Sequence, residues 1–331
     1  MEIYGTLGPA CGDPAVLEAM FRAGMTGLRL NLSHGMLEES RPLLEQMCAA
    51  AEAAGVRPDL LIDLQGPELR VGREGLPLTL TPGGTVSLAR IPLPPAARDA
   101  ARPGTELLLD DGKLLLCVCE GDKARVLRGG VLLPQKSVAI PGFSPALPAL
   151  TEMDHQNLSL AAAFGVTGVM QSFVRDRNDL LEVRNAMEKH GCKGIKLYAK
   201  IESRAGLSSL SDWISLPDVL VIARGDLGNA FPLWELPAIQ KSVAAKARAA
   251  GKPFLVVTQM LASMEKSPVP TRAEVSDIFN AVLDGASAVM LTGETAVGRY
   301  PVEAMTYFCK TAHRAQTWLQ AEGGREWIIS K

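Results

Sequence analysis

Apolar residues recur along the chain in eight short runs that have the length of buried β-strands. The runs begin near Ile3, Gly27, Asp59, Gly168, Lys196, Val219, Pro253 and Ala288. Between most of them, apolar positions follow three- and four-residue spacing, as in segments 14–24 and 238–251, which is typical of amphipathic helices. Several of these segments end in a glycine, such as Gly55 or Gly191, where helices commonly stop. Eight strand and helix repeats predict a (β/α)8 TIM barrel of the α/β class.

One interval breaks this regular alternation. The third run begins at Asp59 and the fourth at Gly168, a separation far too long for one helix and two loops. From about residue 73 to residue 138 the helical period disappears, and short strand-like pieces alternate with hairpin-type turns at 82–84 and 110–112. We therefore expect a barrel formed by residues 1–72 and 139–331. A small all-β lid, residues 73–138, is expected after the third strand, over one side of the barrel mouth.

Two of the apolar runs carry polar side chains at alternate positions. Arg29, Asn31 and Ser33 are spaced to share one face of a strand, and so are Lys200 and Glu202. Burying such groups without partners is costly, so these faces are expected to meet water, a ligand or an ion. In a TIM barrel the active site forms at the carboxyl ends of the strands. The other runs place there Asp63, Ser172, Asp226, Thr258, Thr292 and Glu294.

These residue types combine metal ligands with cations. Glu202 and Asp226, on adjacent strands, offer the carboxylate oxygens that Mg²⁺ accepts alongside water and substrate oxygens. Arg29, Arg70 and Lys200 are suited to phosphate and to a developing enolate or phosphoryl charge. A single polar residue at a strand end is usually only solvated. The repetition of the pattern on consecutive strands instead indicates a site capable of phosphoryl transfer.

Seven short motifs resemble, in the same order, the successive signatures of the pyruvate kinase family. Together they span nearly the whole chain and fall on the predicted strands. They are Arg29–Gly35 (RLNLSHG), Gly66–Arg70 (GPELR), Lys200–Glu202 (KIE), Ala223–Gly228 (ARGDLG), Thr258–Met260 (TQM), Pro270–Glu274 (PTRAE) and Gly293–Thr295 (GET). The resemblance implies transfer of a phosphoryl group from phosphoenolpyruvate to ADP, giving pyruvate and ATP.

The resemblance assigns roles around the phosphoryl group. It implies that Glu202 and Asp226 bind the Mg²⁺ or Mn²⁺ that bridges phosphoenolpyruvate. Lys200 is expected to stabilise the transferring group and the enolate left behind. Arg29 is expected to contact the phosphoryl group, and Ser172 to line the same substrate site.

The resemblance also implies a site for the substrate carboxylate and a place for the nucleotide. The amides of Gly225 and Asp226, with the hydroxyl of Thr258, are expected to hold the carboxylate, in keeping with the anion preference of helix N-termini. Thr258 is also expected to orient the water or proton relay that converts enolpyruvate to pyruvate. The nucleotide contacts implied are Arg70, Lys136 and His34, with the inserted lid closing on the barrel when nucleotide binds.

A K⁺ site is implied as well, although the local sequence gives two conflicting signals. Its ligands would be Asn31, Ser33, Asp63 and the carbonyl of Leu64. In the family, Glu at the position of Glu68 accompanies dependence on K⁺, and Lys there replaces the ion. The neighbours Leu64, Gln65 and Val71 nevertheless resemble those found with the Lys form. Glu68 decides the expectation, because without a lysine there a bound cation best balances the local negative charge.

The composition narrows the class of protein. The 331 residues carry a formal charge of −2 and are 47% hydrophobic, as in an ordinary globular protein with no electrostatic footprint for nucleic acid. The N-terminal sequence MEIYGTLGP lacks the order of a signal peptide, and no apolar run is long enough to cross a bilayer, so we expect a cytoplasmic protein without a membrane partner. Six scattered cysteines without C-x-x-C spacing favour reduced thiols over a zinc site.

The sequence departs from the family pattern in three ways. It begins directly at the first barrel strand, its lid is short, and it stops near the eighth barrel helix. We therefore expect no C-terminal regulatory domain, and a homodimer formed, if at all, through barrel helices. Two other functions stay open: a magnesium-dependent lyase or aldolase acting on pyruvate enolate, and a non-catalytic paralogue that binds a metabolite.

Overall fold

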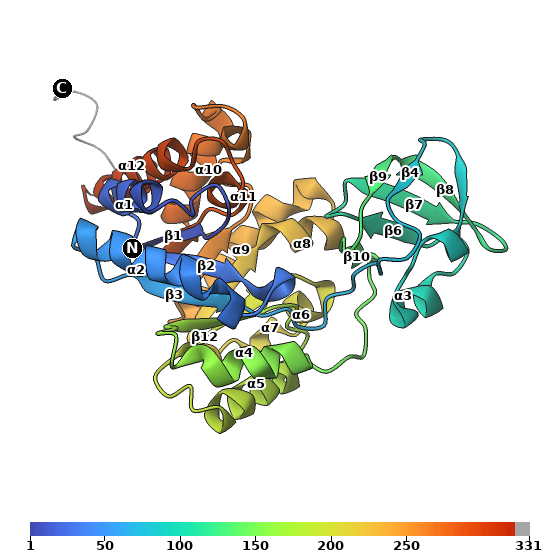
Figure 1. Cartoon of the computed structure of the whole chain (residues 1–331), viewed down its shortest axis with the longest axis horizontal. Helices are drawn as coiled ribbons and strands as arrows, with labels where there is room; N and C mark the ends of the chain where they lie inside the picture. The colour runs from blue at the N-terminus through green and yellow to red at the C-terminus, as the bar shows by residue number, and fades with distance from the viewer. Residues whose placement is uncertain (322–331) are drawn as a thin grey trace.

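The computed structural model describes residues 1–321, and its larger part is a closed barrel of eight parallel strands (Figure 1). Going around the barrel, the strands follow the order β1, β15, β14, β13, β12, β11, β3, β2, and pairing of Glu2 with Ala288 helps to close it. Each strand begins within one residue of its predicted start, which confirms the TIM barrel. The strands are β1 Glu2–Thr6, β2 Gly27–Asn31, β3 Asp59–Asp63, β11 Gly168–Gln171, β12 Lys196–Ile201, β13 Val219–Ala223, β14 Phe254–Val257 and β15 Ala288–Met290.

Helices surround the barrel because their apolar stripes pack against the outer face of the sheet. Helix α1 illustrates the local signals: Asp13 accepts a hydrogen bond from the amide of Ala15 at its start, and Gly24 ends it with φ 116°. Within residues 1–321, no helix combines the length and apolar content that a membrane crossing requires. The barrel helices are α1 Pro14–Ala23, α2 Arg41–Ala54, α4 Glu152–Ala161, α5 Arg177–Lys189, α6 Arg204–Ser208, α7 Leu210–Trp213, α8 Arg224–Ala230, α9 Leu236–Ala249, α10 Arg272–Leu283, α11 Gly293–Ala296 and α12 Pro301–Gln320.

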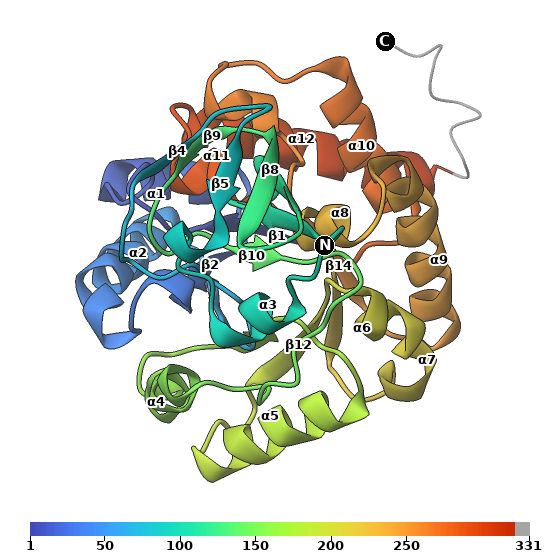
Figure 2. The same cartoon turned by 90° about the vertical axis from the view of Figure 1, so that its right-hand side faces the viewer.

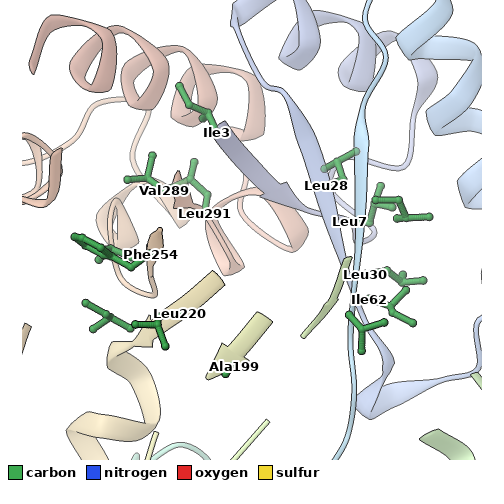
Figure 3. Packing of buried hydrophobic residues seen from close by; sticks show 14 of the residues in the cluster. Ile3, Leu7, Leu28, Leu30, Ile62, Ala199, Leu220, Phe254, Val289 and Leu291 are labelled. Atoms are coloured by element: carbon green, nitrogen blue, oxygen red, sulfur yellow. The ribbon is translucent and has the colours of Figure 1, made fainter. Parts of the chain in front are cut away.

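The barrel has two apolar layers, because successive side chains of a strand point to opposite faces. Ile3, Leu28 and Phe254 belong to the outer layer between strands and helices (Figure 3). Their neighbours Tyr4 and Leu255 belong to a second buried cluster that fills the barrel interior. The barrel is therefore a packed core, and the space for chemistry lies at its mouth. All six cysteines are free, as expected for reduced thiols.

The segment between β3 and α4 forms a separate lid, seen beside the barrel in Figure 1 and in front of the barrel mouth in Figure 2. It is built mainly of β-strands, as expected, but it also contains one short helix, α3 Pro95–Ala100. It has a five-stranded antiparallel sheet in the order β10, β6, β7, β8, β5, and a two-stranded pair of β4 and β9. Its own apolar cluster runs from Leu69 to Ile140, and the boundaries 73–138 stay a prediction. The lid elements are β4 Leu78–Leu80, β5 Thr85–Ser87, α3 Pro95–Ala100, β6 Glu106–Leu109, β7 Leu114–Val118, β8 Lys123–Arg128, β9 Gly130–Leu132 and β10 Val138–Ala139.

One of the two predicted lid hairpins is confirmed and the other is wrong. The turn at 110–112 joins the antiparallel strands β6 and β7, with positive φ at Asp110 and Asp111. The turn at 82–84 also exists, since the amide of Gly84 donates to the carbonyl of Thr81 at 3.0 Å. It does not make a hairpin, because β4 pairs with β9 and β5 pairs with β8. The chain turns there to change sheets.

Short 3₁₀ segments complete the chain between the larger elements. One of them corrects the sequence reading of the second run: β2 ends at Asn31, and Ser33 lies in the 3₁₀ turn that follows. The turn begins there because the side chain of Asn31 accepts a hydrogen bond from the amide of Ser33. These segments are η1 Leu32–His34, η2 Glu38–Ser40, η3 Leu88–Arg90, η4 Leu233–Glu235 and η5 Ala262–Glu265.

Candidate active site

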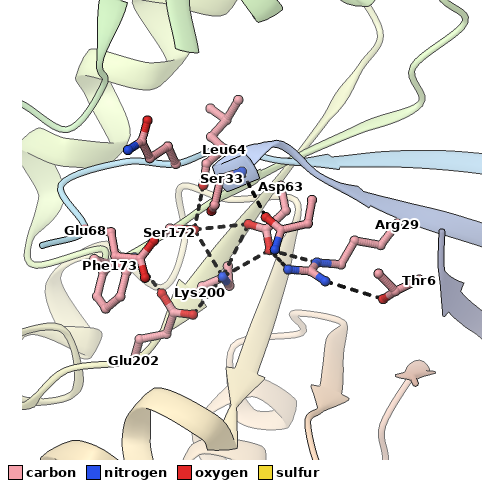
Figure 4. Close-up of polar contacts among 12 residues, drawn as sticks. Thr6, Arg29, Ser33, Asp63, Leu64, Glu68, Ser172, Phe173, Lys200 and Glu202 are labelled. Carbon is pink, nitrogen blue, oxygen red and sulfur yellow. Dashed lines mark hydrogen bonds and ion pairs between the residues drawn. The ribbon is translucent and has the colours of Figure 1, made fainter. Parts of the chain in front are cut away.

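The side chain of Lys200 lies at the centre of the polar site at the barrel mouth (Figure 4). Its Nζ is 2.8 Å from Oε1 of Glu202, 3.1 Å from Oγ of Ser172 and 3.2 Å from Oδ2 of Asp63. These groups come from β3, β12 and the segments that directly follow β11 and β12, three neighbouring strands of the barrel. The prediction that polar residues at the ends of different strands converge is therefore confirmed for these four.

Arg29 reaches the same site from β2. Its Nη2 is 2.6 Å from Oδ2 of Asp63, and its Nε donates to the same oxygen at 2.8 Å. Burial alone would raise the pKa of Asp63, but the positive charges of Lys200 and Arg29 hold that pKa below its usual range. Burial likewise opposes the charge of Lys200, yet Asp63 and Glu202 raise the pKa of the amine above its ordinary value. Burial is thus outweighed here, and the charged forms of Asp63 and Lys200 stabilise each other.

Three carboxyl groups, those of Glu202, Asp226 and Glu68, lie on the other side of Lys200. Oε2 of Glu202 accepts a hydrogen bond of 2.7 Å from the amide of Phe173, which fixes one oxygen and directs the other toward Lys200. Burial, and then the charge of Glu202, raise the pKa of Asp226 well above its usual value. Burial also raises the pKa of Glu68 to about 7, although Arg70 acts in the opposite direction. This side of the site is short of positive charge.

Glu202, Asp226 and Glu68 all line one cavity of about 480 Å³. Its wall also includes Leu108 and Ser137 of the lid, and Phe173 and Arg204 of the barrel. The lid and the barrel therefore enclose the carboxylates together. Two carboxylates at one cavity, Glu202 and Asp226, are suited to Mg²⁺, which accepts one or two protein carboxylates and takes its other ligands from water and substrate.

The oxygens expected to bind K⁺ lie close to the same centre. The hydroxyl of Ser172 contacts Oδ1 of Asp63 at 3.0 Å and the carbonyl of Leu64 at 2.8 Å, so these two oxygens converge on one side. Asn31 and Ser33 are hydrogen-bonded to each other at the end of β2. The four oxygen-bearing residues are suited to a hard cation. Their joint action as K⁺ ligands stays a prediction.

Gly225 and Thr258 meet at the carboxyl ends of β13 and β14. A Cβ on Gly225 would lie 3.0 Å from Cγ2 of Thr258, so the backbone of α8 approaches this side chain closely because residue 225 is a glycine. Thr258 itself has φ 83°, a conformation rarely adopted by a β-branched residue. No hydrogen bond within the described chain joins Thr258 to Lys200. The pair forms a second, adjacent part of the candidate site.

Arg224 is a residue of the candidate site that the sequence reasoning missed. Its Nη2 donates to the carbonyl of Thr258 at 2.8 Å, and it pairs with Asp277 of α10 at 2.7 Å. The arginine therefore holds Thr258 in its unusual backbone conformation and joins three successive barrel units. It was visible in the motif ARGDLG, where it directly precedes Gly225 and Asp226.

Two of the three residues expected to contact nucleotide, Arg70 and Lys136, form ion pairs at or near the lid. Arg70 donates to Glu68 at 2.9 Å and to the carbonyl of Gln135 at 2.7 Å, so its guanidinium is held where the lid meets the barrel. Lys136 pairs with Asp110 of the lid at 2.9 Å. The side chain of His34 lies outside the described residues. Contact of these three residues with nucleotide stays a prediction.

The polar residues after the last strand serve the structure. Glu294 is buried, and its two carboxylate oxygens accept hydrogen bonds from the amides of Leu261 and Thr292 at 3.0 and 2.8 Å. The carboxylate thus connects the loop after β14 to the loop after β15. Both oxygens of Glu294 therefore have hydrogen-bond donors within the fold. Among the described residues, none of these donors belongs to the group around Lys200.

Comparison with known proteins gives the family. The model of the pyruvate kinase barrel domain matches residues 1–89 and 95–305. The chain is 40% identical over 324 residues to "Pyruvate kinase" of Aeropyrum pernix, covering 95% of this chain and 70% of that protein. It is 38% identical over 337 residues to "Pyruvate kinase" of Geobacillus stearothermophilus, covering 96% of this chain but only 57% of that protein. By sequence, by fold and by the residues at its barrel mouth, this chain belongs to the pyruvate kinase family.

Proposed function

We propose that the chain transfers the phosphoryl group of phosphoenolpyruvate to ADP, giving pyruvate and ATP. The observation that carries this proposal is the buried ammonium of Lys200, kept charged by Asp63 and placed 2.8 Å from Glu202. A fixed positive charge in a site with little water is suited to stabilise charge that develops during phosphoryl transfer. Arg29, held by the same aspartate, would contact the phosphoryl group.

Glu202 and Asp226 would hold the divalent metal, Mg²⁺ or Mn²⁺. Their fit is supported by the raised pKa of Asp226, because burial and the charge of Glu202 make two ionised carboxylates costly there. A divalent cation would remove that cost. When bound, it would neutralise phosphate oxygens and help to align the substrates. Glu202 is prepared for this role, since Phe173 and Lys200 fix both of its oxygens.

The substrate carboxylate is expected to bind at Gly225, Asp226 and Thr258. The first two provide amides in the opening turn of α8, and the threonine provides a hydroxyl beside them. After phosphoryl transfer, Lys200 would stabilise the enolate, and Thr258 would orient the water or proton that completes pyruvate. Ser172, hydrogen-bonded to Lys200 and Asp63, would keep the ammonium directed at the substrate.

K⁺ is proposed to bind at Asn31, Ser33, Asp63 and the carbonyl of Leu64. This assignment is supported by the convergence of the oxygens of Asp63 and Leu64 around Ser172. ADP is proposed to bind between lid and barrel, with Arg70, Lys136 and His34 reaching its phosphates. Closure of the lid would then exclude water from the reaction.

We further propose a cytoplasmic enzyme that acts on small molecules, with no nucleic-acid or membrane partner, and a homodimer formed through barrel helices. The dimer is supported by Leu233 and Trp234, which are 69% and 82% exposed in η4, directly before α9. Large apolar side chains left in water at one place commonly mark a protein interface.

A coupled assay for pyruvate formation tests the function directly. Pyruvate should appear only when phosphoenolpyruvate, ADP and Mg²⁺ are all present, and ATP should form in equal amount. A lyase or aldolase would release pyruvate from another substrate without ADP. A binding protein would release none. Pyruvate formation that does not depend on ADP, or its absence with all three reactants present, would contradict the proposal.

A further inference from the structure

Two chain segments connect the lid to the barrel (Figure 1). The outgoing segment leaves β3 at Leu64 and runs through Gln65 and Gly66 toward Glu68. The returning segment follows β10 and ends at Thr151, where α4 begins. Any movement of the lid relative to the barrel must be absorbed in these two segments, because they are its covalent connections.

One buried carboxylate binds both segments. Oδ1 of Asp154 accepts the amide of Gln65 at 2.9 Å, and Oδ2 accepts the amide of Gly66 at 3.1 Å. Oδ2 also accepts the amide and the hydroxyl of Thr151, each at 2.8 Å. The side chain of Asp154 is 0% exposed, so no water competes for these bonds. Hydrogen bonds to an ionised acceptor are about twice as strong as neutral ones.

The simplest reading of Asp154 is a helix cap, because it forms a capping box with Thr151. Helix α10 contains the same box, formed by Thr271 and Glu274. A cap needs partners within its own first turn, however, and Gln65 and Gly66 are 89 and 88 residues away from Asp154. Capping alone does not explain these two bonds.

The outgoing turn also contacts the reaction site. A Cβ on Gly66, whose φ is 60°, would lie 3.2 Å from the carbonyl of Ser172, so this turn packs closely against the end of β11. The hydroxyl of Ser172 in turn contacts Leu64, Asp63 and Lys200. The position at which Asp154 holds the turn therefore sets where the lid leaves the barrel.

We propose that Asp154 is a positioning residue that acts as the fixed pivot of the lid. It holds the outgoing and returning segments at one point on the barrel, so that the lid moves about that point as it closes on nucleotide. This proposal deepens the proposed kinase function, on which its kinetic consequence rests. Its structural consequence, the joint immobility of the two segments, does not depend on any activity.

The test compares Asp154→Asn with the unmodified chain. Asparagine keeps the shape of the side chain, but its NH₂ group takes the place of one carboxylate oxygen. An NH₂ group cannot accept hydrogen bonds, so the donors that faced Oδ2 lose their acceptor. Hydrogen exchange of the amides in segments 64–72 and 140–151 should become at least tenfold faster in both segments together. In the coupled assay, kcat/KM for ADP should fall about tenfold, while KM for phosphoenolpyruvate should stay within twofold, because the proposed phosphoenolpyruvate contacts belong to the barrel.

Two further variants separate the pivot from a simple cap. Asp176→Ala removes the side chain that caps α5 by accepting the amides of Asn178 and Asp179, so it tests loss of a cap away from the lid. It should leave exchange in both lid segments and KM for ADP unchanged. Thr151→Val removes one hydroxyl but keeps the bonds to Gln65 and Gly66, so exchange should accelerate in the returning segment alone.

The outcomes decide the proposal. Unchanged exchange in Asp154→Asn, or faster exchange in one segment only, would overturn the pivot. Faster exchange in both segments with an unchanged kcat/KM for ADP would leave Asp154 as an anchor of both segments but would overturn its role in closing the lid on nucleotide. If Asp154→Asn does not fold, Thr151→Val decides, because acceleration in both segments or in neither would contradict the separate anchoring of the outgoing turn. If the unmodified chain has no kinase activity, the proposed function fails, and the exchange measurements still test the pivot.

Discussion

Lys200 keeps its positive charge in a place where burial alone would remove it. The carboxylates of Asp63 and Glu202 supply the compensation, and Arg29 shares Asp63 with it. The charge is thus in position before any substrate arrives. Groups that are already oriented lower the reaction barrier without a cost of rearrangement during the reaction.

Replacing Lys200 by methionine should therefore lower kcat by about a thousandfold or more, with little change in KM for phosphoenolpyruvate. The reason is that the ammonium acts mainly on charge that develops in the transition state. Glu202→Gln provides the comparison, since loss of a metal carboxylate should also raise the Mg²⁺ concentration needed for half-maximal rate. Steady-state kinetics with a magnesium titration measure both effects. A Lys200→Met enzyme with most of its turnover intact would exclude Lys200 from the mechanism.

Glu68 predicts a pH dependence of stability. Its pKa is about 7 in the folded protein, above its value of about 4.5 in the unfolded chain. The folded state therefore binds more protons, so the stability from protonated Glu68 is complete below about pH 4.5 and is lost as pH rises through 7. Glu68→Gln should flatten this pH dependence, whose total size across the range is roughly 3 kcal/mol at most. Urea unfolding without Mg²⁺ at pH 5, 6, 7 and 8 measures it, and equal slopes in both proteins would refute it.

The same residue bears on K⁺. With glutamate at position 68, activity should fall severalfold or more when K⁺ is replaced by tetramethylammonium at constant ionic strength. Glu68→Lys should lessen this dependence, because a fixed ammonium would supply the positive charge of the ion. Initial rates in the two salts measure the effect for each protein. Equal rates for the unmodified chain would mean that Arg70 or Lys136 already provides that charge.

At the scale of elements, the approach of α8 to the loop after β14 gives a direct test of the carboxylate site. Gly225→Ala would place a methyl group 3.0 Å from Cγ2 of Thr258 and push the two apart. We expect KM for phosphoenolpyruvate to rise about tenfold, with a smaller change for ADP. Gly228→Ala is the matched control in the same helix, because its Cβ would meet the flexible side chain of Leu233 at 3.2 Å. Equal KM values in both variants would remove this contact from substrate binding.

The sequence predicted the elements well where a single pattern decided them. All eight barrel strands were visible, because each is a short apolar run bounded by turn residues. Ser33 was misplaced because alternation of polar residues continued past Asn31, while the capping bond of Asn31 had already ended the strand. The hairpin at 82–84 was wrong because a turn signal does not specify which strands pair.

The residues of the candidate site likewise fall into those that the sequence predicted and those that it did not. Lys200, Asp63 and Glu202 were predicted because a barrel brings its strand ends together, whatever their separation in sequence. Asp154 and Arg224 were missed because they act on the backbone of distant loops. Asp154 carries a local signal, the Thr151-x-x-Asp154 box, but that signal predicts only a helix start.

At the scale of the whole molecule, the barrel and the lid have separate apolar clusters. A chain in which a short linker replaces residues 69–140 should therefore keep a cooperatively folded barrel, since no residue of the barrel clusters is removed. Its transfer of the phosphoryl group to ADP should fall at least a hundredfold, because the lid completes the cavity. Thermal unfolding and the coupled assay measure the two effects. Loss of the cooperative transition would mean that the barrel depends on the lid for folding.

The burial of the charged centre also has a consequence for salt. The side chains of Asp63, Lys200 and Arg29 are only 2%, 12% and 13% exposed, so dissolved salt screens their mutual attraction little. Lys136, on the lid, is 34% exposed and open to screening. Ionic strength acts strongly on exposed charges and weakly on buried ones. An inert salt would therefore weaken the capture of an anionic nucleotide by the lid while leaving the chemistry beneath it almost unaltered.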